Sequence, residues 1–297
     1  MPYINVDEAY ILDNTGLQVD NSVDYANANG NRNLLDNPFF TVNQRDFTTV
    51  TGSASGLALV DRWLAIRATV TQNADNSLTV TPTQAQYGIC QFFEQNRLKV
   101  GQTYTMSALI DNEYYSGSFV FSTSPASEYF ATFSNGIRFY RHVANDKVDV
   151  WVIRSSTTAF TVQAVKLEVG SYSTLINDAP PNYAEELTKC RYYFERIKTG
   201  AKAMTLGFGY PDGYNTLYAH FKINPKRSTS MGLVTGSSFV VGDATGMSTA
   251  VSSASIYNFL ENGEITLALT ATGAFAPPNM YRCGIPANSH VDFSADL

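Results

Sequence analysis

Aromatic side chains stand beside hydrogen-bonding groups at two places where turn-forming residues interrupt the sequence. The segment DNEYYSG carries Tyr114 and Tyr115, and the segment YPDGYN carries Tyr210, Asp212, Tyr214 and Asn215. Pro, Asp, Asn and Gly favour turns, so we expect these side chains to be exposed. An exposed ring can stack on the apolar face of a sugar while nearby amides and carboxylates bind its hydroxyl groups. The alternative is that these tyrosines line a subunit interface, where Tyr is also enriched.

Residues typical of metal binding or nucleophilic catalysis do not form a recognisable set. His142, His220 and His290 are isolated in the sequence, with no second ligand at helical or hairpin spacing, so we expect no metal site. The segment SHVD, residues 289–292, contains the residue types of a catalytic triad. A working triad converges from separate loops, however, whereas neighbours on one strand point to opposite faces.

A glycosidase would need two carboxylates that face each other across a cleft. Asp111 with Glu113, or Asp146 with Asp149, are possible pairs, but nothing in the sequence ranks one above the other. The GxG within residues 207–213 precedes a proline rather than a helix, so it does not indicate a phosphate site. We therefore expect no catalytic residues and no cofactor.

Composition excludes several further classes of protein. Charged residues make up 15% of the chain, the net charge is −6, and no basic run is present, so nucleic-acid binding is not expected. No apolar stretch approaches the roughly 18 residues of a membrane span, so we expect no membrane insertion. The start MPYINVDEAY lacks the features of a secretion signal. Three widely separated cysteines, Cys90, Cys190 and Cys283, suggest reduced, mostly buried thiols in a protein assembled in a cytosol.

Short segments rich in β-branched and aromatic residues alternate with turn residues along most of the chain, which is typical of an antiparallel sandwich. The predicted strands in the first part are residues 63–70, 77–81, 104–110, 118–121, 137–143, 148–153 and 159–169. Those in the second part are residues 217–223, 228–235, 238–241, 253–259, 264–270 and 291–297. Trp63 is predicted to be a core residue, whereas the face of Trp151 is ambiguous, because apolar residues lie on both faces of its strand.

One helix interrupts the strands. Asn182 can cap it, and Tyr183, Leu187, Cys190 and Phe194 form one helical stripe, so we expect a helix over residues 183–196. The sequence therefore predicts an all-β protein: a jelly-roll β-sandwich, one linking helix and a smaller C-terminal β-sandwich domain. The boundaries we expect are residues 33–176, 177–198 and 199–297.

Residues 1–32 differ in composition from the rest. Leu12, Val19 and Ala26 recur every seven residues, as in a short coiled-coil seam, while Asn, Asp and Gly dominate the remainder. We interpret this segment as an arm for attachment or oligomerisation, with a flexible tether as the alternative.

Two sequence motifs carry a resemblance to a known family. NLLDNPFF at residues 33–40, followed by VNQR at residues 42–45 and DRW at residues 61–63, resembles the start of a jelly-roll module of bacteriophage tail fibres and receptor-binding proteins. It is similar, more distantly, to carbohydrate-binding jelly rolls attached to glycoside hydrolases. The segments VKLEVGSYST, residues 165–174, and PPNYAEELTKCRYYF, residues 180–194, resemble the end of that module. The resemblance is strongest between residues 33 and 195.

The first motif also has a physical interpretation. Asn33, Asp36 and Asn37 favour a turn before Pro38, and the apolar residues around them can fix that turn to the sandwich. We interpret the motif as scaffold that closes one end of the jelly roll.

The resemblance implies a structural protein of the virion, a homotrimer that joins tail or capsid proteins through its N-terminal arm and binds a host surface glycan. It assigns no binding residues. A head fibre or capsid decoration protein with the same modules is the first alternative. A glycan depolymerase is the second, although no long repeat is present to house its cleft. A host lectin is the third.

Overall fold

The computed structural model describes residues 32–178, 181–212, 215–226, 232–234, 239–243, 246–260, 262–271, 275 and 279–295. The predicted N-terminal arm and its heptad spacing lie outside the described residues. The chain divides into two compact units, Met1–Glu186 and Leu187–Leu297, called unit 1 and unit 2 below. None of the helices in the described ranges has the length and hydropathy needed to span a membrane.

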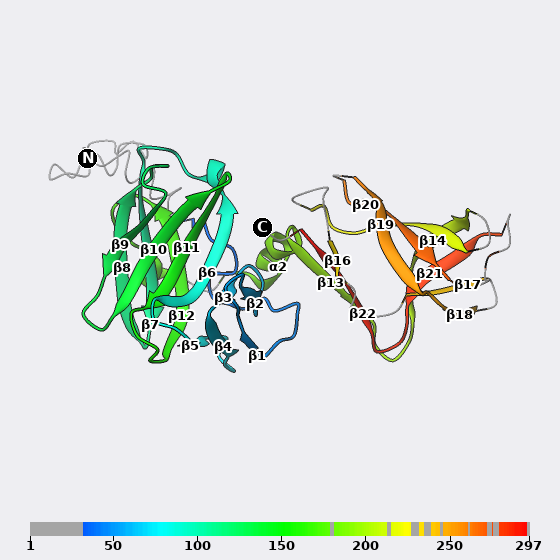
Figure 1. Ribbon diagram of the computed structural model, residues 1–297, viewed down its shortest axis with the longest axis horizontal. Coiled ribbons are helices and arrows are strands. Elements are labelled where there is room, and N and C mark those ends of the chain that lie inside the picture. The colour runs from blue at the N-terminus through cyan, green and yellow to red at the C-terminus, as the bar shows by residue number, and fades with distance from the viewer. Residues whose placement is uncertain are drawn as a thin grey trace, which may run out of the picture. The chain divides into compact units, whose positions relative to one another are not determined.

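Unit 1 contains two six-stranded sheets, which are visible in Figure 1. Sheet A has the order β1-β4-β5-β12-β7-β8, with β1 (Thr49–Thr51), β4 (Ala68–Gln72), β5 (Leu78–Pro82), β12 (Phe160–Val169), β7 (Thr103–Ile110) and β8 (Glu113–Val120). Sheet B has the order β2-β3-β6-β11-β10-β9, with β2 (Leu57–Ala58), β3 (Leu64–Ile66), β6 (Tyr87–Glu94), β11 (Lys147–Arg154), β10 (Ile137–Ala144) and β9 (Ser127–Thr132). All the strand pairs in both sheets are antiparallel.

The two sheets enclose one hydrophobic core built from alternating side chains. On β10, Ile137, Phe139 and Val143 are buried in this core, whereas Tyr140 and His142 lie on the other face. Because side chains alternate along a strand, one face of each strand is available for the core and the other for solvent or ligands. The prediction of an all-β, jelly-roll-like sandwich is confirmed.

The prediction of one continuous strand over residues 63–70 is wrong. Arg67 has a positive φ of 44°, a left-handed conformation that ends β3 and starts β4 in the other sheet. The chain therefore crosses between sheets at this residue. Strands β6 and β9 were not predicted, because β6 has apolar residues at consecutive positions and β9 begins within residues that the sequence assigned to a turn.

The first motif is part of the scaffold, as predicted. Asn33 donates to Val165 O at 2.8 Å and accepts from Leu167 N at 3.1 Å, which attaches the motif to β12. Asn37 donates from its amide to the carbonyls of Val42 and Asp61, each at 2.9 Å. These hydrogen bonds satisfy buried polar groups at one end of the sandwich.

Trp63 belongs to the core, again as predicted. Its side chain is 1% exposed and packs edge-on against Phe40, with 5.3 Å between ring centroids. The indole Nε1 donates to Asn37 O at 3.0 Å. The ring therefore joins the first motif to the hydrophobic core.

The helix α2 (Tyr183–Arg191) is shorter than the predicted 183–196. Asn182 Oδ1 accepts from Ala184 N at 2.8 Å, as expected of an N-cap. The residues after Arg191 are aromatic, and Phe194 starts the strand β13 (Phe194–Lys198), which pairs with β22. The segment assigned to linker and helix thus contains a strand of unit 2. Two short 3-10 helices, Gln95–Arg97 and Leu175–Asn177, complete the helical elements of the described residues.

Unit 2 contains a three-stranded sheet C and a seven-stranded sheet D. Sheet C has the order β13-β22-β16, with β22 (His290–Ser294) and β16 (Gly232–Val234). Sheet D has the order β18-β17-β21-β14-β15-β20-β19, with β18 (Gly246–Ala250), β17 (Val240–Asp243), β21 (Tyr281–Ile285), β14 (Met204–Pro211), β15 (Thr216–Lys222), β20 (Glu264–Thr270) and β19 (Ser253–Phe259). The GxG of residues 207–209 lies in β14, where a Cβ on Gly207 would be 2.1 Å from His220 O. These glycines therefore allow close approach of two strands.

Candidate functional site

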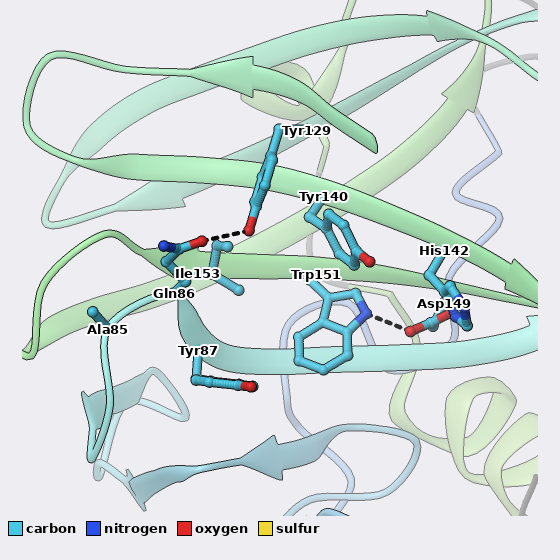
Figure 2. Close-up of a pocket in the computed structure, with 9 residues that line it drawn as sticks. All are labelled: Ala85, Gln86, Tyr87, Tyr129, Tyr140, His142, Asp149, Trp151 and Ile153. Carbon is cyan, nitrogen blue, oxygen red and sulfur yellow. Dashed lines mark hydrogen bonds and ion pairs between the residues drawn. The ribbon is translucent and has the colours of Figure 1, made fainter. Parts of the chain in front are cut away.

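Three aromatic side chains lie side by side on the outer face of sheet B. Tyr140 on β10 is the cross-strand neighbour of Tyr129 on β9 and of Trp151 on β11. Since cross-strand neighbours point to the same face of a sheet, the three rings form a row across three strands. Figure 2 shows this row, with Tyr87 from the start of β6 facing it.

The rings are tilted against one another rather than coplanar. Tyr129 and Tyr140 have centroids 5.0 Å apart and an interplanar angle of 48°, and Tyr140 and Trp151 are 6.0 Å apart at 80°. They enclose an open pocket of about 540 Å³. Its lining comprises Ala85, Gln86, Tyr87, Tyr129, Tyr140, His142, Asp149, Trp151 and Ile153. Called the aromatic pocket below, it is large enough for a small ligand or for part of a chain.

Asp149 holds two polar groups of the pocket in place. Its carboxylate accepts from the indole Nε1 of Trp151 and lies 3.0 Å from Nδ1 of His142. His142 is the cross-strand neighbour of Asp149, so the register of the hairpin creates this pair. Burial of the carboxylate raises the pKa of Asp149 above its usual value, although the hydrogen bond from Trp151 and the nearby His142 oppose this effect. Asp149 therefore orients both rings from beneath the surface.

The far side of Trp151 is bordered by small residues of β6. Cys90 is its cross-strand neighbour and is fully buried, and burial raises the pKa of this thiol well above its usual range. Gly88 stands opposite Ile153, and a Cβ at Gly88 would lie 2.3 Å from Val152 O. This part of the sheet consequently has no room for a larger side chain at Gly88, and the thiol of Cys90 is not poised to react.

Polar groups at both ends of the row can hydrogen-bond a ligand. Gln86 accepts from the hydroxyl of Tyr129 at 2.7 Å, which leaves the amide nitrogen of Gln86 as a donor at one end. The imidazole of His142 lies at the other end (Figure 2). Rings flanked by hydrogen-bonding groups suit a ligand that has both apolar faces and hydroxyl groups.

The structure separates the two tyrosines predicted to lie in a turn. Tyr114 and Tyr115 lie in β8, not in a turn, because the chain reverses at Asp111 and Asn112, which both have positive φ. Tyr115 is 8% exposed and packs edge-on against Phe133 in the core, with 4.9 Å between centroids. Tyr115 therefore serves the core, whereas Tyr114 stays exposed.

The second predicted group lies in unit 2. Tyr210 is 60% exposed and is the cross-strand neighbour of Tyr218, but it is in β14 rather than in the turn. Asp212 N donates to Thr216 O at 2.9 Å across the β14–β15 connection, and Asn215 O accepts from Ala271 N at 3.0 Å, which joins the start of β15 to the end of β20. Tyr214 lies outside the described residues. A binding role for this group stays a prediction.

The segment SHVD does not form a triad. Asp292 makes a two-point ion pair with Arg196, at 2.7 and 2.6 Å, and His290 Nε2 lies 3.9 Å from it. Ser289 N donates to Thr199, which fixes the start of β22. Within the described ranges, no group of three or more His, Cys, Asp and Glu residues is placed to hold a metal ion.

The aromatic pocket was not predicted from the sequence, because β6 and β9, which carry Tyr87 and Tyr129, were not predicted. A usable signal nevertheless existed in the two-residue turn of Asn145 and Asp146, which both have positive φ as in a type I′ hairpin turn. Such a turn sets Ala144 opposite Lys147 and therefore Tyr140 opposite Trp151 and His142 opposite Asp149. His142 was predicted to be isolated, but this register pairs it with Asp149, so that prediction is wrong.

Comparisons with known proteins give little further information. No family model matches the chain, and no curated protein matches it. Among solved structures, the chain is similar to the N-terminal CBM22-1–CBM22-2 tandem domain of Xyn10C from Paenibacillus barcinonensis, with 12% sequence identity over 90% of this chain and 96% of that one. The TM-score is 0.26, which does not establish a common fold.

Proposed function

We propose that this protein binds glycans through the aromatic pocket of unit 1. The observation that carries the proposal is the row of Tyr129, Tyr140 and Trp151, flanked by the hydrogen-bonding groups of Gln86 and His142. Sugar rings present apolar C–H faces and hydroxyl edges, so a tilted aromatic wall with polar ends matches their chemistry. Rings that are tilted against one another suit a single soluble glycan chain better than the flat surface of a crystalline polysaccharide.

The lining of the pocket supports binding rather than hydrolysis. Asp149 is the one carboxylate among the residues that line it, and it is buried beneath Trp151 and His142. Hydrolysis of a glycosidic bond by the common mechanisms needs a second carboxylate across the bond. We therefore propose adhesion without catalysis.

The biological setting that we propose is the virion of a bacteriophage. Support comes from the motifs at residues 33–45, 61–63 and 165–194, which resemble those of tail-fibre and receptor-binding proteins. In this setting residues 1–32 attach the protein to tail or capsid proteins, the protein is a homotrimer, and the aromatic pocket meets a host surface glycan. Immunolabelled virions in negative stain, together with light scattering on the full chain, test this part. Unlabelled virions or a stable monomer would contradict it.

A matched pair of tyrosine variants tests glycan binding. The full chain is screened on an array of bacterial surface glycans, and the best ligand is titrated against Tyr140→Ala and Tyr172→Ala. Tyr172 is 72% exposed and lies outside the pocket, so it controls for loss of a surface ring. We expect Tyr140→Ala to weaken binding by roughly ten-fold or more and Tyr172→Ala to leave it unchanged. Equal affinities of wild type and Tyr140→Ala would refute the site.

A further inference from the structure

An arginine without an acidic partner borders the aromatic pocket. Arg138 on β10 is half-buried, and its guanidinium carbon lies 5.3 Å from the ring centroid of Tyr129, a cation–π contact. Its Nε is buried without a hydrogen-bond partner, and no carboxylate within the described ranges forms an ion pair with it. A guanidinium has five N–H donors and stays charged at all ordinary pH values, so this group has unused binding capacity.

The position of Arg138 places this charge at one end of the pocket. Arg138 is the cross-strand neighbour of Ile153 and precedes Tyr140 by two residues, so it shares the outer face of sheet B with both. Tyr129 and Ile153 lie at the end of the pocket that also holds Gln86 (Figure 2). A ligand group that reaches this end therefore meets Arg138.

A second arginine stands over another ring of the pocket. The guanidinium carbon of Arg67 lies 5.1 Å from the ring centroid of Tyr87. Arg67 donates a hydrogen bond to the neutral side chain of Gln84 and has no carboxylate partner among the residues that the structure describes. Two of the four aromatic side chains of the pocket thus carry a cation that no acidic group neutralises.

The one carboxylate of the pocket does not offset these cations. Asp149 lies at the opposite end, beside His142 (Figure 2), and its charge faces the donors of Trp151 and His142. An anionic group bound near Ile153 would therefore meet attraction from Arg138 with little repulsion from Asp149.

We propose that the aromatic pocket selects glycans that carry carboxylate groups, such as chains containing uronic acids, and that Arg138 is the residue that determines this selectivity. The inference rests on the proposed glycan binding and adds the chemical class of the glycan to it. Arginine pairs with carboxylates through two parallel N–H···O bonds, which gives directional as well as electrostatic selectivity.

The test uses oligosaccharides of polygalacturonate, alginate and hyaluronan, each beside its carboxyl-reduced form. Titrations compare the wild-type full chain with Arg138→Met, which keeps an unbranched side chain against Tyr129, and with Arg138→Lys, which keeps the charge. Lys202→Met is the control, because it removes one positive charge from an exposed position of unit 2.

We expect the wild type to bind an acidic oligosaccharide roughly ten-fold or more tightly than its reduced form. Arg138→Met should remove most of this preference and leave the affinity for the reduced form unchanged. Arg138→Lys should retain part of the preference, and Lys202→Met should retain all of it. Equal affinities of the wild type for the acidic and the reduced form would refute the inference while leaving glycan binding intact. An equal loss of affinity for both forms in Arg138→Met would refute it in the same way. A wild type that binds neither form but binds a neutral glycan of the array would refute the inference and leave the proposed function intact. A wild type that binds no glycan in either experiment would contradict both.

Discussion

The two tryptophans of the chain allow a sharp test, because the structure places Trp63 in the core and Trp151 in the lining of the aromatic pocket. Replacing Trp151 by Ala removes the half-exposed ring that forms one wall of the aromatic pocket. It also removes the indole N–H that donates to the carboxylate of Asp149. The change should therefore affect binding strongly and folding only moderately.

The magnitudes follow from what each group contacts. A tryptophan at the centre of a binding site contributes about 2 kcal/mol or more, which corresponds to a roughly 30-fold weaker Kd on truncation. Trp151 is not one of the residues of the hydrophobic core of unit 1, so the substitution removes no side chain from that core. Asp149 keeps His142 as a partner but loses one donor, which should lower the free energy of unfolding by about 1–2 kcal/mol.

The assay combines calorimetric titration with the best array ligand and urea unfolding of the same preparations. Trp151→Phe serves as the intermediate variant, because it keeps an aromatic face and loses only the N–H donor. We expect the Phe variant to lose as much stability as the Ala variant but less affinity. If Trp151→Ala bound the ligand as tightly as wild type, or lost affinity only in proportion to unfolded protein, the assignment of this face as the binding site would be refuted.

Three further predictions concern the scaffold. Trp63→Ala should lower the free energy of unfolding of unit 1 by about 3–5 kcal/mol, since the ring is buried against Phe40, and urea unfolding would contradict this by showing an unchanged midpoint. Burial raises the folded-state pKa of Asp149 above 3.8, so between 3.8 and that raised value the native state binds more protons than the unfolded state. The stability of wild type relative to Asp149→Asn should therefore fall as pH rises above about 3.8, and a difference that stayed constant with pH would show that the folded-state pKa of Asp149 is not raised. Cys90 and Cys283 should resist iodoacetamide in the native protein at pH 8, because burial raises the pKa of both thiols, that of Cys283 to about 12. Rapid labelling of either cysteine without unfolding would argue against its burial.

The sequence by itself determined the class of fold and much of the scaffold. Alternating strands separated by turn residues indicated a sandwich, and the polar residues of the first motif indicated a turn fixed to it. Trp63 was assigned to the core for the same local reasons. These inferences succeeded because strand periodicity and turn chemistry act over a few neighbouring residues.

Tertiary structure alone decided where the aromatic pocket lies. The strand of Trp151 has apolar residues on both faces, so its sequence did not reveal which face sheet A covers. Tyr87 and Tyr129 join the pocket from β6 and β9, far from Trp151 in sequence, through pairings that no local pattern specifies. The break at Arg67 also depends on the two sheets, because a single left-handed residue moves the chain from one to the other. The alternation of side chains along a β-strand fixes which residues share a face. Only the packing of one sheet on the other decides which face stays accessible.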